Sequence, residues 1–216
     1  MKTLIVIPMK DPRQSKQRLS GVLSAHHRQQ LALSLFEQTL IFFRDRFGDY
    51  PVLVVTSSER IRAMAGRYGA RVLLETPATG LNGAAGLAAQ WSCAQGYDAQ
   101  LLIPADIAVL DEQEIGQLLE QRRESPWVSI CPAHDGGTNA LMTSPPDAVP
   151  FRFGVDSSEV HRAAARQRGV QAVMLKLKNL AFDVDNPVDL QQLAGAPHRI
   201  LNRIQTQEIV NACAFH

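Results

Sequence analysis

The sequence predicts an α/β protein in which a mostly parallel sheet carries helices on both faces. Short apolar runs rich in β-branched residues alternate with longer segments whose apolar residues recur at helical spacing. Turn-forming residues separate the two kinds of segment. Such alternation implies right-handed βαβ units, in which ligands bind beyond the carboxyl ends of the strands. The loops expected at these ends are residues 8–18, 76–82 and 104–107.

The first element is a buried strand at residues 4–9, because this apolar run is too short for a signal peptide and lacks a small-residue cleavage site. A polar loop, residues 10–21, separates it from a long helix that begins near Ser24. Apolar side chains recur along that helix at Leu31, Leu35, Phe36, Leu40, Phe43 and Phe47. The Gly-Asp-Tyr-Pro sequence at residues 48–51 ends the helix.

The alternation continues to residue 132 and then changes. Further strands are expected at 52–55, 72–74, 101–103 and 127–131, with helices at 59–68, 82–95 and 111–121. Beyond them come a turn at 135–139, a short strand at 140–143, a helix at 157–168, a β run at 170–177 and a helical turn at 189–193. The tail, residues 200–213, suits a terminal helix and a contact in a homodimer.

The composition is that of a soluble globular protein. Of 216 residues, 45% are hydrophobic and 20% charged, and the formal net charge is +1. Near-neutral charge gives no reason to expect nucleic-acid or membrane partners, and no segment has the ~18 consecutive apolar residues of a membrane span. We expect a single domain at residues 1–196, a helical tail at 197–216 and a cytoplasmic location, which three unevenly spaced cysteines also fit.

The loop after the first strand carries four cations, Lys10, Arg13, Lys16 and Arg18. At the carboxyl edge of a sheet these side chains would hold a polyphosphate, with lysine as a point charge and arginine as a fork. The alternative is a solvated loop, because short basic runs are common. No GxGxxG or Walker A pattern is present, which disfavours dinucleotide binding and P-loop chemistry.

Three aspartates are candidate ligands of a hard cation: Asp106 after the fourth strand, and Asp183 with Asp185. Residues i and i+2 of an extended segment point the same way, so Asp183 and Asp185 would share a face. Magnesium binds one or two carboxylates and completes its shell with water and substrate phosphates. The three carboxylates and four cations therefore suit a magnesium–nucleotide complex. The alternative is an Asx turn at 185–187 before a helix at Asp189.

Two glycine-containing loops are candidate anion sites. In residues 135–139 the glycines let backbone amides approach a ligand, and Thr138 offers a hydroxyl; the alternative is a hairpin turn. Gly154 and Ser157 stand at the start of a predicted helix, whose N-terminus attracts anions. The alternative is that Asp156 or Ser157 only caps that helix. The histidines form no metal-binding pattern and none is assigned to catalysis, and no GxSxG elbow supplies a nucleophile.

Several of these segments, taken together, resemble one family. Residues 5–10 and 15–19, IVIPMK and SKQRL, resemble its opening IPVK…AKSRL, and later blocks match at 80–82, 104–106, 135–141, 151–154 and 180–187. The family is the 2-phospho-L-lactate, phosphoenolpyruvate and 3-phospho-D-glycerate guanylyltransferases of deazaflavin (F-420) cofactor biosynthesis. The match runs in order from residue 4 to about residue 194.

The resemblance implies a three-layer, Rossmann-like nucleotide-diphospho-sugar-transferase fold. It implies a reaction in which a phosphorylated three-carbon acid attacks the α-phosphorus of GTP and pyrophosphate leaves. It also implies roles for single residues. Lys10, Lys16, Arg18 and Asp106 would be catalytic; Pro8, Lys10, Lys16, Arg18, Thr76, Gly80, Leu81 and Asn82 would bind GTP; Thr138, Gly154 and Ser157 would bind the acid; and Asp106, Asp183 and Asp185 would bind Mg²⁺.

The chain departs from the family at residues 106–108, where it reads Asp-Ile-Ala and the family reads Asp-Leu-Pro. Loss of that proline is expected to loosen the loop beside the metal. The acid stays open among phospholactate, phosphoenolpyruvate and phosphoglycerate. Two other functions also stay open: transfer of CMP or UMP to a sugar phosphate or molybdopterin-like acceptor, and nucleotide binding without catalysis.

Overall fold

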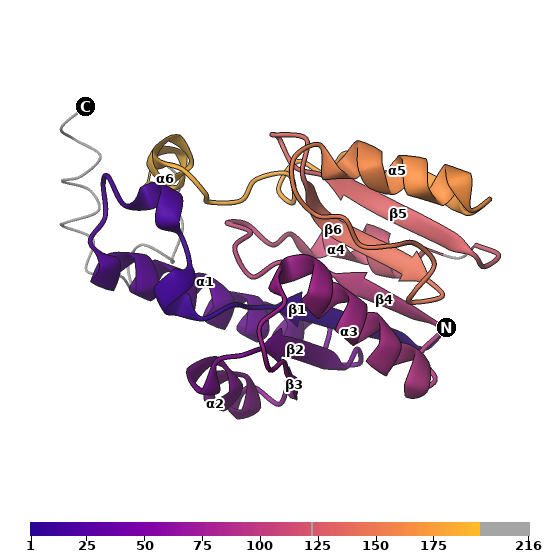
Figure 1. Ribbon diagram of the computed structural model, residues 1–216, viewed down its shortest axis with the longest axis horizontal. Helices are drawn as coiled ribbons and strands as arrows, with labels where there is room; N and C mark the ends of the chain where they lie inside the picture. Colours follow the sequence, from indigo (N-terminus) through magenta and orange to yellow (C-terminus); the bar gives the residue numbers. More distant parts are fainter. Residues whose placement is uncertain (122, 195–216) are drawn as a thin grey trace.

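One seven-stranded sheet organises the protein, as a computed structural model that describes residues 1–121 and 123–194 shows (Figure 1). The strand order is β3-β2-β1-β4-β6-β5-β7. Neighbouring strands are parallel except at β6, which is antiparallel to both β4 and β5. The prediction of a mostly parallel sheet is therefore confirmed.

The elements follow the predicted alternation closely. The strands are β1 (Thr3–Pro8), β2 (Val52–Thr56), β3 (Arg71–Leu74), β4 (Ala99–Leu102), β5 (Trp127–Pro132), β6 (Thr138–Ser144) and β7 (Gln171–Met174). The helices are α1 (Ala25–Arg46), α2 (Glu59–Arg67), α3 (Gly80–Ala94), α4 (Glu112–Leu119), α5 (Ser157–Gln167) and α6 (Pro187–Ala194). Two short 3₁₀ turns, η1 (Pro12–Gln14) and η2 (Gln17–Leu19), lie in the loop after β1. The predicted helical tail lies outside the described residues.

Helices cover both faces of the sheet, which gives three layers (Figure 1). β1 is an inner strand between β2 and β4, and its alternate side chains enter different cores. Ile5 and Ile7 pack with buried residues of α1, α2 and α4, whereas Leu4 and Val6 pack with the alanines of α3. α5 covers β5 and β6 on the same face as α3. Burial on both faces explains why β1 is a continuous apolar run. Among the described residues, no helix combines the length and apolarity needed to span a bilayer.

A separate hydrophobic cluster fixes the segments around the carboxyl edge of the sheet. Leu19 of η2, Leu31 and Leu35 of α1, and Val184 pack together with the inner side of α6. The loop after β1 and the segment before α6 are far apart in the sequence, and this cluster brings them together. On the other side of that segment, the Glu114 carboxylate of α4 accepts hydrogen bonds from the backbone N–H groups of Asn179 and Leu180, at 2.9 Å each.

The loop at residues 106–108 is anchored by backbone pairing with the segment before α6. Ile107 forms a β-bridge with Asp183. The N–H of Val184 donates to the carbonyl of Asp106, and the N–H of Ala108 donates to the carbonyl of Phe182, both at 3.2 Å. Backbone pairing on both sides of Ile107 thus restrains this loop.

Candidate active site

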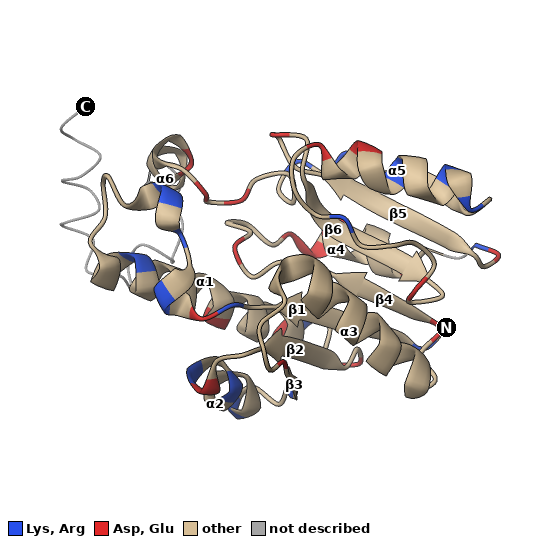
Figure 2. Ribbon diagram, viewed as in Figure 1, with Lys and Arg blue, Asp and Glu red and all other residues tan. Residues whose placement is uncertain are grey.

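Three aspartates converge at the carboxyl edge of the sheet. One carboxylate oxygen from each of Asp106, Asp183 and Asp185 lies within 4.8 Å of the other two. Val184 is fully buried in the cluster with Leu19, so its neighbours Asp183 and Asp185 turn to the opposite side. The prediction that these two carboxylates share a face is confirmed. The segment before α6 and the loop after β1 lie at the same edge, where acidic and basic positions meet (Figure 2).

Lys16 joins the aspartates from the opposite loop. Its Nζ donates to Asp106 Oδ2 at 2.9 Å and to Asp185 Oδ1 at 3.0 Å, and its side chain is 4% exposed. Burial alone would lower the pKa of this ammonium, but the charges of Asp106 and Asp185 outweigh that effect and raise the pKa above its ordinary value. The backbone of Lys16 is left-handed, with φ of 54°, which a non-glycine residue adopts only at a cost.

The other three cations of the loop are placed differently. Arg18 Nη1 lies 3.6 Å from Asp185 Oδ2, and its side chain is 72% exposed. Lys10 is exposed on the wall of the cavity described below. Arg13 pairs with Asp11 at 2.7 Å and does not line that cavity. The solvated-loop interpretation therefore holds for Arg13 and is wrong for the buried Lys16.

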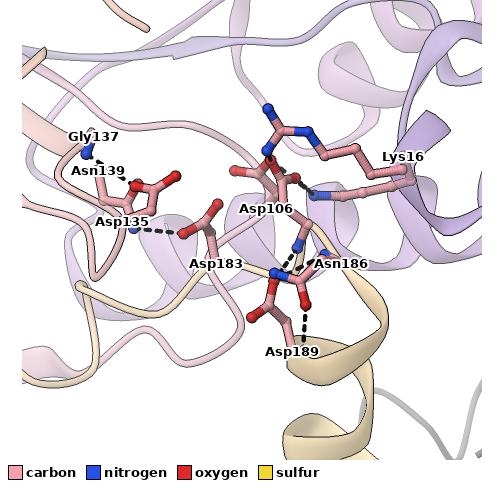
Figure 3. A network of polar contacts seen from close by, with 10 residues as sticks. Lys16, Asp106, Asp135, Gly137, Asn139, Asp183, Asn186 and Asp189 are labelled. Carbon is pink, nitrogen blue, oxygen red and sulfur yellow. Dashed lines mark hydrogen bonds and ion pairs between the residues drawn. The ribbon is translucent and has the colours of Figure 1, made fainter. Parts of the chain in front are cut away.

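The carboxylate of Asp183 is partly buried beside Asn139 and the other two aspartates. Burial, with smaller contributions from the charges of Asp106 and Asp185, raises the pKa of its carboxyl to about 6. Asn139 opposes this by donating from Nδ2 to Asp183 Oδ1 at 3.1 Å. Figure 3 shows Asp183 between Asn139 on one side and Asp106 with Lys16 on the other. Carboxylate oxygens are ligands of hard divalent cations, so these three residues could hold such an ion.

The Asx turn considered as an alternative is also present. Asn186 Oδ1 accepts from the N–H of Asp189 at 3.1 Å, and Asp189 Oδ2 accepts from the N–H groups of Asp185 and Asn186 at 2.9 Å (Figure 3). These reciprocal hydrogen bonds form a capping box at the first turn of α6. They use the backbone of Asp185 and leave its carboxylate to Lys16, so the turn and the acidic cluster coexist.

A cavity of about 380 Å³ opens beside the aspartates, a volume typical of small-molecule sites. Of the residues predicted to bind GTP, those on its wall are Pro8, Lys10, Lys16, Gly80 and Leu81, together with Asp106 and Asp185. Arg18, Thr76 and Asn82 do not line it, and neither does Asp183. Asn82 instead binds the backbone of Phe153, accepting from its N–H at 2.6 Å and donating to its carbonyl at 3.2 Å. It therefore ties α3 to the loop that precedes α5.

The predicted acid-binding hydroxyls meet in a buried chain of hydrogen bonds. Ser157 Oγ donates to Thr138 Oγ1 at 3.0 Å, and Thr138 Oγ1 lies 3.1 Å from His161 Nδ1. The N–H of Arg152 donates to His161 Nε2 at 3.0 Å, which leaves the ring proton on Nδ1, facing Thr138. Burial lowers the pKa of His161 to about 4, so the ring is neutral at neutral pH. Because Thr138 Oγ1 accepts twice, its own hydroxyl proton stays available for another acceptor.

The two glycine-containing loops thus come together, although Thr138, Gly154 and Ser157 do not line the 380 Å³ cavity. The hairpin alternative for residues 135–139 is also correct, because this turn joins β5 to antiparallel β6. The capping alternative for α5 is wrong. Asp156, with φ of 50°, makes no side-chain cap, and the hydroxyl of Ser157 is directed to Thr138. Asn139, next to Thr138, links this region to Asp183.

Three residues with clear places in or near the site were not predicted from the sequence: Glu75, Asn139 and His161. Glu75 directly follows β3 at the carboxyl edge, and that position is the signal that could have identified it. Asn139 lies inside a recognised motif. His161 is fully buried, and its role depends on contacts across the fold that sequence spacing does not reveal.

Comparisons with known proteins identify the family of this chain. The family model "Guanylyl transferase CofC like" matches residues 3–196. A 3-phospho-D-glycerate guanylyltransferase of Colwellia psychrerythraea is 49% identical over 99% of each chain. A phosphoenolpyruvate guanylyltransferase of Sphaerobacter thermophilus is 34% identical over 90% of this chain and 94% of its own.

Solved structures of low identity support the fold. A protein of Desulfovibrio desulfuricans G20, provisionally described as a nucleotide-diphospho-sugar transferase, superposes with a TM-score of 0.74 at 18% identity, covering 97% of this chain and 94% of its own. A cytidylyltransferase from Leptospira borgpetersenii gives a TM-score of 0.62 at 10% identity, covering 100% and 98%. With the sequence relatives, these findings show that the chain belongs to the CofC-like guanylyl transferase family and is a nucleotidyltransferase.

Proposed function

We propose that the protein transfers the guanylyl group of GTP to a small phosphorylated three-carbon acid, with Mg²⁺, for deazaflavin coenzyme biosynthesis. The observation that carries this proposal is the meeting of buried Lys16 with three aspartates beside a cavity of nucleotide size. We take 3-phospho-D-glycerate as the first acid to test, because the Colwellia relative named for it is 49% identical over 99% of both chains. Phosphoenolpyruvate and 2-phospho-L-lactate are the other acids in question.

The reaction balances without a general base. A phosphate oxygen of the acid, already anionic, forms a bond to the α-phosphorus of GTP. The bond from that phosphorus to the bridging oxygen of the leaving pyrophosphate breaks, and the electron pair leaves with the pyrophosphate. The obstacle is repulsion between two anions, so catalysis depends on charge neutralisation and alignment.

The residues of the site address that repulsion in distinct ways. Asp106, Asp183 and Asp185 would hold Mg²⁺, which when bound supplies positive charge to the triphosphate. Lys16 is fixed by its two carboxylate partners and brings a permanent cation to the cavity wall. Arg18 and Lys10 are exposed at the same edge and suit the outer phosphates. Thr138, Gly154 and Ser157 would receive the acid, with the Thr138 hydroxyl proton as the available donor.

A nucleotide panel tests the guanine part of the proposal. GTP with Mg²⁺ should raise the melting temperature more than CTP, UTP or ATP, because a ligand that binds only the folded state stabilises it. GTP should also be the nucleotide that releases pyrophosphate when an acid is added. Preferential stabilisation by CTP, with CTP-dependent turnover, would refute the guanine assignment and favour transfer of another nucleotide.

A further inference from the structure

Glu75 is a buried carboxylate on the cavity wall that has no role in the proposed guanylyl transfer. Glu75 follows β3 directly, and its backbone N–H donates to the carbonyl of Thr56 at 3.0 Å. The whole residue is 7% exposed. It lines the same cavity as Lys16 and Asp106. Because β3, β2, β1 and β4 are adjacent, the ends of β3 and β4 lie roughly 14 Å apart, three strand spacings. Glu75 and the aspartates thus stand at opposite ends of one elongated site.

The hydrogen bonds of Glu75 leave half of its carboxylate unused. Oε2 accepts from Thr79 N–H at 3.1 Å and from Thr79 Oγ1 at 3.0 Å. Within the part of the chain that the structure describes, Oε1 accepts no hydrogen bond. Oε1 is not among the buried polar atoms that are sealed from solvent without a partner, so it stays open to the cavity that Glu75 lines. A donor in that cavity can replace the water that otherwise solvates Oε1.

We propose that Glu75 selects the guanine base, with Oε1 accepting hydrogen bonds from the N1–H and the N2 amino group of guanine. This inference rests on the proposed function and adds its base-specificity determinant. Guanine offers two adjacent donors on this edge, and a carboxylate oxygen offers only acceptors. Adenine and cytosine each present an unprotonated ring nitrogen there, and uracil flanks its one N–H with carbonyls, so each would bring an acceptor against the carboxylate.

The surroundings of Glu75 suit a base at this end of the cavity. Pro8, Val55, Leu81 and Ala84 give the wall apolar surface, on which a flat ring can lie. The other charged residues of the wall come from the loops after β1 and β4 and from the segment before α6: Lys10, Lys16, Asp106 and Asp185. The base of a nucleotide would thereby lie on apolar surface, and its phosphates would lie among charged side chains.

The simpler interpretation is that Glu75 only orders the start of α3 through Thr79. The two interpretations differ in what they predict for ITP, which lacks the N2 amino group and retains N1–H. If Glu75 binds that amino group, the wild type prefers GTP to ITP in kcat/KM by about 10- to 100-fold, the value of one hydrogen bond to a charged group. A residue that orders the helix alone affects both nucleotides equally.

The test compares GTP with ITP in pyrophosphate release by the wild type, Glu75→Gln and Thr79→Ala. Glutamine keeps an acceptor for Thr79 and turns an amide donor toward the guanine donors. We expect Glu75→Gln to melt within about 4 °C of the wild type, to lose at least about 100-fold in kcat/KM for GTP, and to show a GTP-to-ITP ratio near 1 or below. Thr79→Ala removes one partner of Glu75, keeps its charge, and should retain the wild-type ratio.

An unchanged ratio in a folded Glu75→Gln variant would overturn this inference and leave guanylyl transfer intact. Absence of GTP turnover by the wild type with every acid would overturn both. If Glu75→Gln does not fold, N1-methyl-GTP and ITP binding to the wild type decide the matter. Binding of both as tight as that of GTP would refute recognition of this edge, whereas weaker binding of both supports it.

Discussion

Replacing Asp183 by asparagine should stabilise the metal-free protein while removing its activity. The carboxyl of Asp183 has its pKa raised from 3.8 to about 6, chiefly by burial. A carboxyl whose pKa is higher in the folded than in the unfolded state costs stability as pH rises from the unfolded to the folded value, and the loss is complete above the folded value. The full difference corresponds to about 3 kcal/mol at neutral pH, and partial solvent access reduces it, so we expect Asp183→Asn to gain about 1–3 kcal/mol.

Asp183→Asn removes the negative charge of this side chain and keeps its hydrogen bond to Asn139. The asparagine Oδ1 can still accept from Asn139 Nδ2, so the 3.1 Å hydrogen bond is kept. Repulsion from Asp106 and Asp185 is relieved. One of the three ligand oxygens loses its charge, so we expect pyrophosphate release to fall at least about 100-fold.

The assay is urea unfolding in EDTA at about pH 7.5, paired with pyrophosphate release in Mg²⁺. Asp49→Asn is the matched control, because Asp49 is exposed and precedes β2 at the opposite end of that strand from the site. It should stay within about 0.5 kcal/mol of the wild type and keep normal turnover. The reasoning is refuted if Asp183→Asn is less stable than the wild type in EDTA, or if it turns over normally.

Three further outcomes follow from the same site. Lys16→Met should lower the free energy of unfolding in EDTA by about 1–3 kcal/mol, less than for a fully buried ion pair because the carboxylate partners of Lys16 are 33% and 40% exposed. It should also reduce turnover at least about 100-fold. Unchanged stability would contradict the buried pairing. Thr138→Val and Ser157→Ala should each raise KM for the acid about fivefold or more and leave KM for GTP nearly unchanged, whereas equal effects on both substrates would indicate a structural role. His161, whose pKa is lowered to about 4, takes up a proton between about pH 6.5 and 4 only in the unfolded chain. The free energy of unfolding of the wild type should therefore fall by roughly 3 kcal/mol relative to His161→Gln over that range. Unfolding curves at several pH values measure this difference, and a constant difference would count against a buried neutral ring.

The fold could be predicted from local patterns because its strands and helices differ in periodicity. The continuous apolar run of β1 and the helical spacing from Leu31 to Phe43 each determine their element. The antiparallel direction of β6 depends on pairing with β4, which no local pattern encodes. The left-handed backbone of Lys16 was equally invisible, because a lysine gives no sign of positive φ.

The site was predictable where the sequence itself shows an alternation of buried and exposed residues. Asp183-Val184-Asp185 shows its alternation in the sequence, and the structure confirms that the buried valine directs both aspartates outward. Asn82 shows the limit of that approach, because its partner Phe153 lies 71 residues away along the chain. His161 shows the same limit, since its role arises only when α5 packs beside β6 and the loop of Arg152.

The central claim is that Lys16 and the three aspartates bring a phosphorylated acid to the α-phosphate of GTP. Its most direct test is phosphorus NMR of a mixture of wild-type protein, GTP, Mg²⁺ and 3-phospho-D-glycerate, repeated with phosphoenolpyruvate and 2-phospho-L-lactate. We predict a new diphosphate-linked guanosine product and an equal amount of pyrophosphate with at least one acid, and neither with Asp183→Asn. GTP that stays intact with all three acids, or pyrophosphate without a diphosphate-linked product, would contradict the claim.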